Sequence, residues 1–173
     1  GSLAQVSTLV SEIRGTGDQP VLVLDSGDTI EGTPFEQFPH VRWSEPSPTI
    51  AAMNHIGYDA MAVGNHEFNF GLDVLARARA QADFPFLSAN TIEESSSQRA
   101  FPTHMVIEAG EVRVGVIGLV TPNIPGWEVP EHYAGLEFRH IALEFGDLAL
   151  GVVELLLGLG LRGLEFGHGA LEF

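Results

Sequence analysis

The stretch DAMAVGNHEFNFG, residues 59–71, places three polar side chains directly after a short apolar run. The run DAMAV is typical of a buried β-strand, because it is short and almost wholly apolar. The side chains that follow it belong to Asn65, His66 and Glu67. Amide, imidazole and carboxylate groups are among those with which proteins bind divalent metal ions. The order of these residues therefore predicts a chemical site where a buried strand ends.

A second stretch, PVLVLDSGD at residues 20–28, has the same pattern. Its apolar run predicts another buried strand, and the carboxylates of Asp25 and Asp28 follow at its carboxyl end. Aspartates in such a loop also form turns and helix caps, and this interpretation stays open, for Asp25 in particular. In α/β proteins, functional residues gather in the loops at the carboxyl ends of parallel strands. Both polar loops are therefore expected at that edge of a sheet.

Helical and strand-like segments alternate along the chain. The apolar spacing predicts helices at residues 3–13, 47–57 and 71–82, and strands at residues 84–90 and 111–120. Gly15 and Gly17 are expected to stop the first helix. The alternation favours an α/β fold class with a mostly parallel sheet.

The composition excludes several classes of protein. The chain has 173 residues and a net charge of −15, from 23 acidic residues and eight basic ones, all arginine. Such a chain repels a nucleic-acid polymer. It contains no cysteine, so disulfides and thiolate metal sites are excluded. The longest apolar stretch, Leu148 to Leu161, falls short of the roughly 20 residues that a membrane span needs.

The composition changes at Ala134. Residues 134–173 contain no Ser, Thr, Asn, Gln, Pro or Lys, and LEF recurs at 136, 143, 164 and 171. Frequent glycines argue against a coiled coil despite the seven-residue spacing. A helix from about Asp147 and a strand ending at His168 still fit the pattern. We interpret residues 1–2 as an expression-vector remnant and residues 3–173 as a single partial domain that includes this low-complexity segment.

Two loops, LDSGDTIEGTP at residues 24–34 and GNHEF at residues 64–68, carry a resemblance to a known family. With the intervening AAMNHIGYDAM, they resemble the calcineurin-like metallophosphoesterase superfamily, in its branch of 5'-nucleotidases and 2',3'-cyclic-nucleotide 2'-phosphodiesterases. The resemblance runs from about Leu3 to Trp127. It implies a layered sheet sandwich flanked by helices, here incomplete. The family's first motif, Asp-x-His, and its last, Gly-His-x-His, are absent, as in a chain truncated at both ends.

The resemblance also implies a site for two divalent metal ions, of Mn, Zn, Fe, Co or Mg. Asp28 matches the family's bridging carboxylate, and Asn65 matches its neutral oxygen ligand. His66 matches a residue that binds no metal but stabilises the transferring phosphoryl group and protonates the leaving oxygen. His168 lies where a further metal ligand of the family falls, give or take one residue.

The residues around these positions have supporting roles in the same family. Asp25 and Glu67 are expected behind the ligands, where they orient the loops. Gly64 is expected to let the backbone turn sharply. With two motifs absent, one metal keeps three of its four protein ligands, the other keeps only Asp28, and His66 lacks the carboxylate that orients it in the family. We therefore expect this chain to bind fewer ions than its family, one or none.

Five further histidines stand apart from this pattern. No spacing ties them together, so we expect each to be exposed or locally hydrogen-bonded rather than a metal ligand. They are His40, His55, His104, His132 and His140.

The implied activity is metal-dependent hydrolysis of a nucleotide phosphomonoester or a 2',3'-cyclic phosphodiester; another small phosphate ester, such as a sugar nucleotide, is a second substrate class. An alternative from a different functional class is a catalytically incomplete fragment that acts only as a folded, metal-binding or structural module. Catalysis requires the missing ligands from an oligomer partner or from further chain, and the family's C-terminal substrate domain is absent. The family is typically exported, so a periplasmic or extracellular location is expected.

Overall fold

The computed structural model describes residues 2–31 and 47–140. The chain divides after His140 into two units, and only the first, residues 1–140, contains described residues. The helix and strand predicted between Asp147 and His168 lie outside the described residues, and so does the apolar stretch from Leu148. The single-domain interpretation of residues 3–173 stays a prediction.

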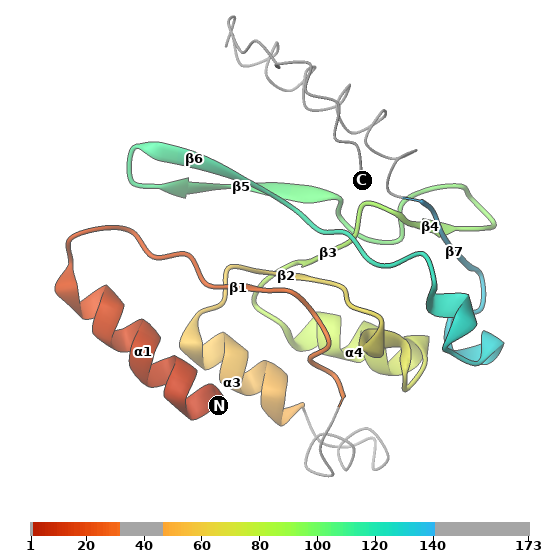
Figure 1. Ribbon diagram of the computed structural model, residues 1–173, viewed down its shortest axis with the longest axis horizontal. Helices are drawn as coiled ribbons and strands as arrows, with labels where there is room; N and C mark the ends of the chain where they lie inside the picture. Colours follow the sequence, from red (N-terminus) through yellow and green to blue (C-terminus); the bar gives the residue numbers. More distant parts are fainter. Residues whose placement is uncertain (1, 32–46, 141–173) are drawn as a thin grey trace, which may run out of the picture. The chain divides into compact units, whose positions relative to one another are not determined.

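A three-stranded parallel sheet positions the two polar loops. Its order is β1-β2-β3, with β1 at Leu24–Asp25, β2 at Ala60–Ala62 and β3 at Phe86–Leu87. Leu24 pairs with Ala60, and Met61 pairs with Phe86 (Figure 1). Each strand lies inside a segment where a strand was predicted. The strands are shorter than predicted, and the Asp59 carboxylate extends the first pairing by accepting the Val23 N–H at 2.7 Å.

The three described α-helices are α1 at Leu3–Thr16, α3 at Pro48–Ile56 and α4 at Leu72–Gln81. Ser47 caps the first turn of α3, and Gly57 ends it with a positive φ of 77°, a conformation that glycine adopts without strain. The helix α1 continues through Gly15 and ends where Gly17 adopts a φ of 69°, so only the second of the two predicted stops ends it. Among the described residues, no helix is long and apolar enough to cross a membrane.

The main core lies between the parallel sheet and two of these helices, α3 and α4, as Figure 1 shows. It joins residues of β2 and β3 to the buried faces of both helices and includes Ile50, Met53, Met61, Val74, Leu75, Ala78 and Phe86. Helix α1 packs through a smaller cluster of Val10, Val23 and Ile56. The Arg14 guanidinium also links α1 to the end of α3, because it donates to the Ile56 carbonyl at 2.6 Å and to the Gly57 carbonyl at 2.9 Å.

Two antiparallel pairs complete the described part of the chain. Strand β5, His104–Ala109, forms a hairpin with β6, Val112–Ile117. Strand β4, Thr91–Glu93, pairs with β7, Leu136–Phe138. The α/β class is confirmed and the three-stranded sheet is parallel as predicted, but the strand predicted at residues 111–120 lies in an antiparallel hairpin. No strand was predicted at β5 or at the first LEF, which forms β7.

Candidate functional site

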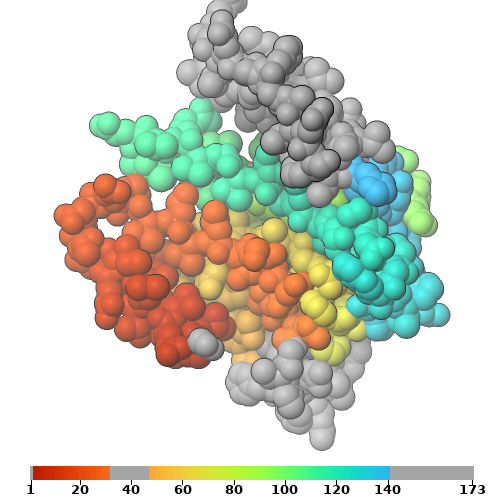
Figure 2. Space-filling model, in the orientation of Figure 1, coloured from red at the N-terminus to blue at the C-terminus, as the bar shows by residue number. Residues whose placement is uncertain are grey.

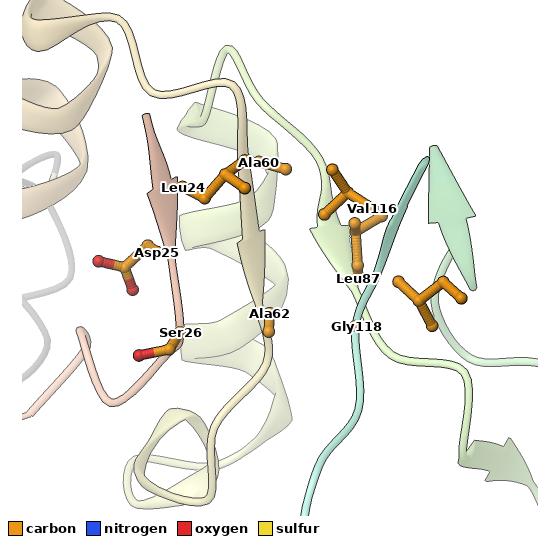
Figure 3. Close-up of a pocket in the computed structure, with 9 residues that line it drawn as sticks. Leu24, Asp25, Ser26, Ala60, Ala62, Leu87, Val116 and Gly118 are labelled. Atoms are coloured by element: carbon orange, nitrogen blue, oxygen red, sulfur yellow. The ribbon is translucent and has the colours of Figure 1, made fainter. Parts of the chain in front are cut away.

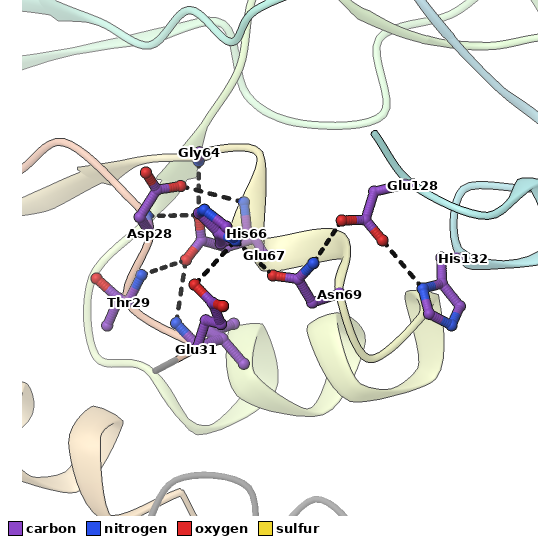
Figure 4. A network of polar contacts seen from close by, with 10 residues as sticks. Asp28, Thr29, Glu31, Gly64, His66, Glu67, Asn69, Glu128 and His132 are labelled. Carbon is purple, nitrogen blue, oxygen red and sulfur yellow. Dashed lines mark hydrogen bonds and ion pairs between the residues drawn. The ribbon is translucent and has the colours of Figure 1, made fainter. Parts of the chain in front are cut away.

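The two polar loops meet at the carboxyl ends of the neighbouring strands β1 and β2. Asp28 follows β1, and Asn65 and His66 follow β2. The Oδ1 atom of Asp28 accepts the backbone N–H of His66 at 3.1 Å (Figure 4). Residues that are far apart in the sequence are thus brought together because their strands pair in parallel.

The buried carboxylate of Glu67 joins the two loops. The residue has an exposed fraction of 0%. Its Oε2 accepts the N–H groups of Asp28 at 2.8 Å and of Gly64 at 2.6 Å, and its Oε1 accepts those of Thr29 at 2.6 Å and Ile30 at 3.2 Å. Burial raises the pKa of the Glu67 carboxyl, and the four backbone donors oppose that rise. Glu67 therefore fixes the distance between the loops through their backbones.

The loops approach each other so closely that two positions have no room for a side chain. A Cβ atom added to Gly64 would lie 2.6 Å from the Asp28 nitrogen and 2.8 Å from Glu67 Oε2. A Cβ atom added to Gly27 would lie 2.7 Å from the Gly64 Cα. Gly64 does not have a positive φ, so its backbone conformation does not require glycine. Close packing of the two loops requires it instead.

The conformation that favours glycine occurs at Asp28, whose φ is 62°. A non-glycine residue in this region is uncommon, and such residues concentrate at functional sites. The preceding Asp25 stabilises the loop, because its Oδ1 accepts the Gly27 N–H and the Thr29 hydroxyl, each at 2.9 Å. These contacts agree with the interpretation, left open above, that Asp25 serves to form the turn.

The imidazole of His66 is held at one nitrogen. Its Nδ1 lies 2.7 Å from Asn69 Oδ1 and 2.8 Å from Glu31 Oε2. The hydrogen bond with Asn69 is the largest cause of a raised pKa of His66; burial opposes the rise, and the nearby carboxylates of Glu31 and Asp28 add to it. Although His66 was expected to lack the family's orienting carboxylate, the Glu31 carboxylate contacts its ring.

A second carboxylate, that of Glu128, lies behind this contact. The Nδ2 of Asn69 donates to Glu128 Oε1, and Glu128 Oε2 lies 3.1 Å from His132 Nδ1 (Figure 4). Figure 2 shows the segment around Glu128, in cyan, against the segment around Asn69, in yellow. Asn69 and Glu128 were not among the predicted site residues. Asn69 could have been found, since it lies three residues after His66 and so faces it in a helical turn; nothing near Glu128 marks it.

The described residues fit part of a metal site. Asp28 and Asn65 offer the oxygen ligands that hard divalent ions prefer. The Glu67 oxygens are already occupied by backbone donors. Among residues 2–31 and 47–140, no group of three or more His, Cys, Asp or Glu residues could hold an ion. His168 lies outside the described residues, so its predicted role stays untested.

Two of the five histidines that were not expected to bind metal make local contacts. His132 contacts Glu128, and Nδ1 of His104 lies 2.7 Å from the Thr103 hydroxyl, as expected of locally hydrogen-bonded residues. His40 lies outside the described residues.

A pocket of about 300 Å³ lies beside this site (Figure 3). It is mainly apolar at the sheet and polar at the β1 end, and its lining residues are Leu24, Asp25, Ser26, Ala60, Ala62, Leu87, Val116, Ile117 and Gly118. Asp25 is the one predicted site residue that lines it. The pocket therefore adjoins the loop of Asp28 without containing the cluster around His66.

Known proteins resemble this chain in sequence and in fold. Protein UshA of Salmonella pullorum is 39% identical over 145 residues, which are 82% of this chain and 26% of that protein. The calcineurin-like phosphoesterase YfkN of Bacillus subtilis superposes with a TM-score of 0.75 at 26% identity, over 89% of this chain and 50% of the other. The 5'-nucleotidase precursor of Thermus thermophilus gives a TM-score of 0.70 at 29% identity, over 94% of this chain and 30% of the other. No protein-family model matches the chain. The chain thus spans about a quarter of the length of the UshA protein it matches.

Proposed function

Because this chain belongs to the calcineurin-like metallophosphoesterase superfamily, we propose that it forms part of an enzyme that hydrolyses nucleotide phosphate esters with the help of divalent metal ions. The substrates proposed are nucleoside 5'-monophosphates or 2',3'-cyclic nucleotides. A periplasmic or extracellular location is proposed on the same resemblance.

One observation carries this proposal: Asp28 and the Asn65–His66 pair lie at one edge of the sheet, joined by the 3.1 Å hydrogen bond from the His66 backbone N–H to Asp28 Oδ1. A carboxylate and an amide oxygen there can bind a hard divalent ion, and an imidazole next to them can serve proton transfer. The buried Glu67 holds both loops in this arrangement. Metal ligands and a proton-transfer group are thus adjacent on a rigid support.

Each residue has a role in the proposed reaction. Asp28 and Asn65 hold metal, and His168 is a further ligand from the part of the chain outside the described residues. Divalent ions held by these residues would activate water for attack and would neutralise charge on the phosphate. His66 stabilises the phosphoryl group and gives a proton to the leaving oxygen. Asp25 and Glu67 orient the loops that carry these groups.

Metal binding and hydrolysis test separate parts of this proposal. We expect saturable Mn²⁺ binding by calorimetry, weakened at least tenfold in Asn65→Ala and unchanged in Asn123→Ala, an exposed asparagine elsewhere in the chain. We also expect Mn²⁺-dependent release of phosphate from AMP and ring opening of 2',3'-cyclic AMP, both lost in His66→Ala.

The outcomes separate the proposal from its rival. Saturable metal binding without hydrolysis would favour the alternative, a catalytically incomplete fragment that acts as a metal-binding or structural module. Absence of saturable binding, or binding unchanged in Asn65→Ala, would overturn the metal site itself. Hydrolysis that survives in His66→Ala would identify a contaminating phosphatase or overturn the role of His66.

A further inference from the structure

A row of side-chain contacts runs from His66 to His132 (Figure 4). His66 Nδ1 contacts Asn69 Oδ1 at 2.7 Å, Asn69 Nδ2 donates to Glu128 Oε1, and Glu128 Oε2 contacts His132 Nδ1 at 3.1 Å. His66 and Asn69 follow β2, Glu128 lies between the short helices η2, Ile124–Gly126, and η3, Pro130–His132, and His132 is the last residue of η3. The row extends the proposed site beyond the residues with assigned roles.

The chemistry of each group fixes the direction of the hydrogen bonds. An ionised carboxylate only accepts hydrogen bonds, so the side of Asn69 that faces Glu128 must be its NH₂ group. The Asn69 carbonyl oxygen then faces the imidazole and can only accept. The ring nitrogen that contacts it, Nδ1, must therefore carry a hydrogen. A flipped Asn69 amide would place its oxygen against the Glu128 carboxylate, and the two acceptors would repel each other.

Glu128 is a fixed end of this row. Its side chain has an exposed fraction of 9%, and its backbone N–H donates to the carbonyl of the buried Ile124 at 2.9 Å. His132 contacts its second carboxylate oxygen. The other acceptor near His66 Nδ1, Glu31, has a side chain that is 38% exposed. Water competes for the carboxylate of Glu31 more than for that of Glu128, which is 9% exposed, so the contact through Asn69 sets the direction of the hydrogen bonds more strongly.

We infer that Glu128 is a positioning residue that acts through Asn69 and holds the neutral His66 ring in the form with its hydrogen on Nδ1. In this form the Nε2 lone pair can accept a proton, and only the imidazolium so formed can then give that proton to the leaving oxygen. The catalytic meaning of this arrangement rests on the proposed function, whereas the state of the ring does not. Neither residue touches the reacting atoms.

Nitrogen NMR of the ¹⁵N-histidine-labelled chain measures the ring state directly, at a pH where His66 is neutral. The His66 signals are identified by their loss in His66→Gln. In the parent chain we expect Nδ1 to be the protonated nitrogen. In Glu128→Leu and in Asn69→Leu we expect the ratio of the Nδ1–H form to the Nε2–H form to fall roughly five- to tenfold, the effect of losing one hydrogen bond.

Three further variants make the result specific. Glu128→Gln keeps an acceptor for Asn69 Nδ2, so it should preserve the parent ratio. Glu131→Gln removes an exposed carboxylate from the same turn and should also leave the ratio unchanged. Glu31→Gln should change the ratio less than Asn69→Leu does. Circular dichroism establishes that each variant is folded, and Asn69→Leu suffices should Glu128→Leu not fold.

An unchanged ratio in both Glu128→Leu and Asn69→Leu would overturn the inference, as would a ratio that only Glu31→Gln alters. The hydrolysis assay separates this result from the proposed function. In an active chain, Asn69→Leu should lower kcat with little change in KM, because His66 stays present but is misaligned. An inactive parent chain with the expected NMR result would contradict the proposed function and leave the positioning role standing.

Discussion

The carboxylate of Glu67 contacts four backbone N–H groups, whereas the carboxylate of Glu128 contacts two side chains. Glu67 is fully buried, the Glu128 side chain is 9% exposed, and both lie near His66. Glu67 holds main chain and so determines where the two loops run. Glu128 holds the Asn69 amide and so determines how one ring is oriented. The comparison indicates that loop position and side-chain orientation depend on separate anchors, which substitutions can affect one at a time.

The largest effect is expected from Glu67→Leu. Four backbone donors lose their acceptor in a buried place, and each unsatisfied donor costs about 1–3 kcal/mol. Partial rearrangement of the loops reduces the sum, so we expect a loss of about 4 kcal/mol in the free energy of unfolding, measured with urea. Glu94→Leu, at an exposed glutamate, is the control and should change it by less than about 0.5 kcal/mol. An equal effect in the two variants would contradict the anchoring role of Glu67.

A smaller effect is expected where the loops touch. Gly64→Ala adds a methyl group within 2.8 Å of Glu67 Oε2, so the loops must separate, at a cost of about 2 kcal/mol. The matched control is Gly15→Ala in α1, where a Cβ atom would meet nothing within 4 Å. That change should stabilise the chain by about 0.5–1 kcal/mol, because alanine is the better helix residue. If the urea midpoint fell equally in both variants, lack of room for a Cβ atom could not be the reason that position 64 requires glycine.

Glu128→Leu should destabilise the chain less than Glu67→Leu does. Only two side-chain donors lose their acceptor, and both Asn69 and His132 are partly exposed, so water can replace it. We expect the free energy of unfolding, measured with urea, to fall by about 1–2 kcal/mol in Glu128→Leu and to show no resolved change in Glu131→Leu. A loss as large as that of Glu67→Leu would remove the distinction between the two anchors.

The smallest effect concerns pH. The pKa of His66 is raised, first by the hydrogen bond with Asn69, so the folded chain binds this proton more tightly than the unfolded chain does. Its contribution to stability is therefore fully present below about pH 6.5, the usual histidine value, and is lost as the pH rises through the folded pKa. The urea midpoint of the parent chain relative to His66→Gln should therefore fall as the pH rises from about 6.5 through the raised pKa of the folded chain.

The variant Asn69→Leu sharpens this result. Its His66 should titrate at a lower pH than in the parent chain, followed by NMR, because the main cause of the rise is gone. A larger decrease in Glu31→Gln would show that the exposed ion pair, rather than Asn69, controls the ring.

Local signals in the sequence predicted the helices and the polar loops. Ser47 and Gly57 mark the ends of α3 because capping depends on residues within one turn. The loops of Asp28 and Asn65 were predicted to gather at one sheet edge because parallel strands present their carboxyl ends on the same side. The chemical roles assigned to these residues remain predictions.

Contacts between distant segments were not predictable in the same way. The pairing of β4 with β7 and the contact of Asn69 with Glu128 join residues whose neighbours carry no pattern that relates them. Gly64 was predicted to matter for a local turn, yet its role depends on the second loop, which packs against it. These features depend on tertiary packing. Packing between distant segments leaves no periodic pattern of apolar residues that could be recognised in a single sequence.

Hydrogen exchange at the four backbone amides bonded to Glu67 can measure how often the two loops separate. Those of Asp28, Thr29 and Ile30 come from one loop and that of Gly64 from the other, yet they share one buried acceptor. None can exchange with deuterium from solvent until Glu67 leaves its place, so the four should exchange together, as one cooperative unit. Their common exchange rate would then report how often the two loops part in the absence of any ligand.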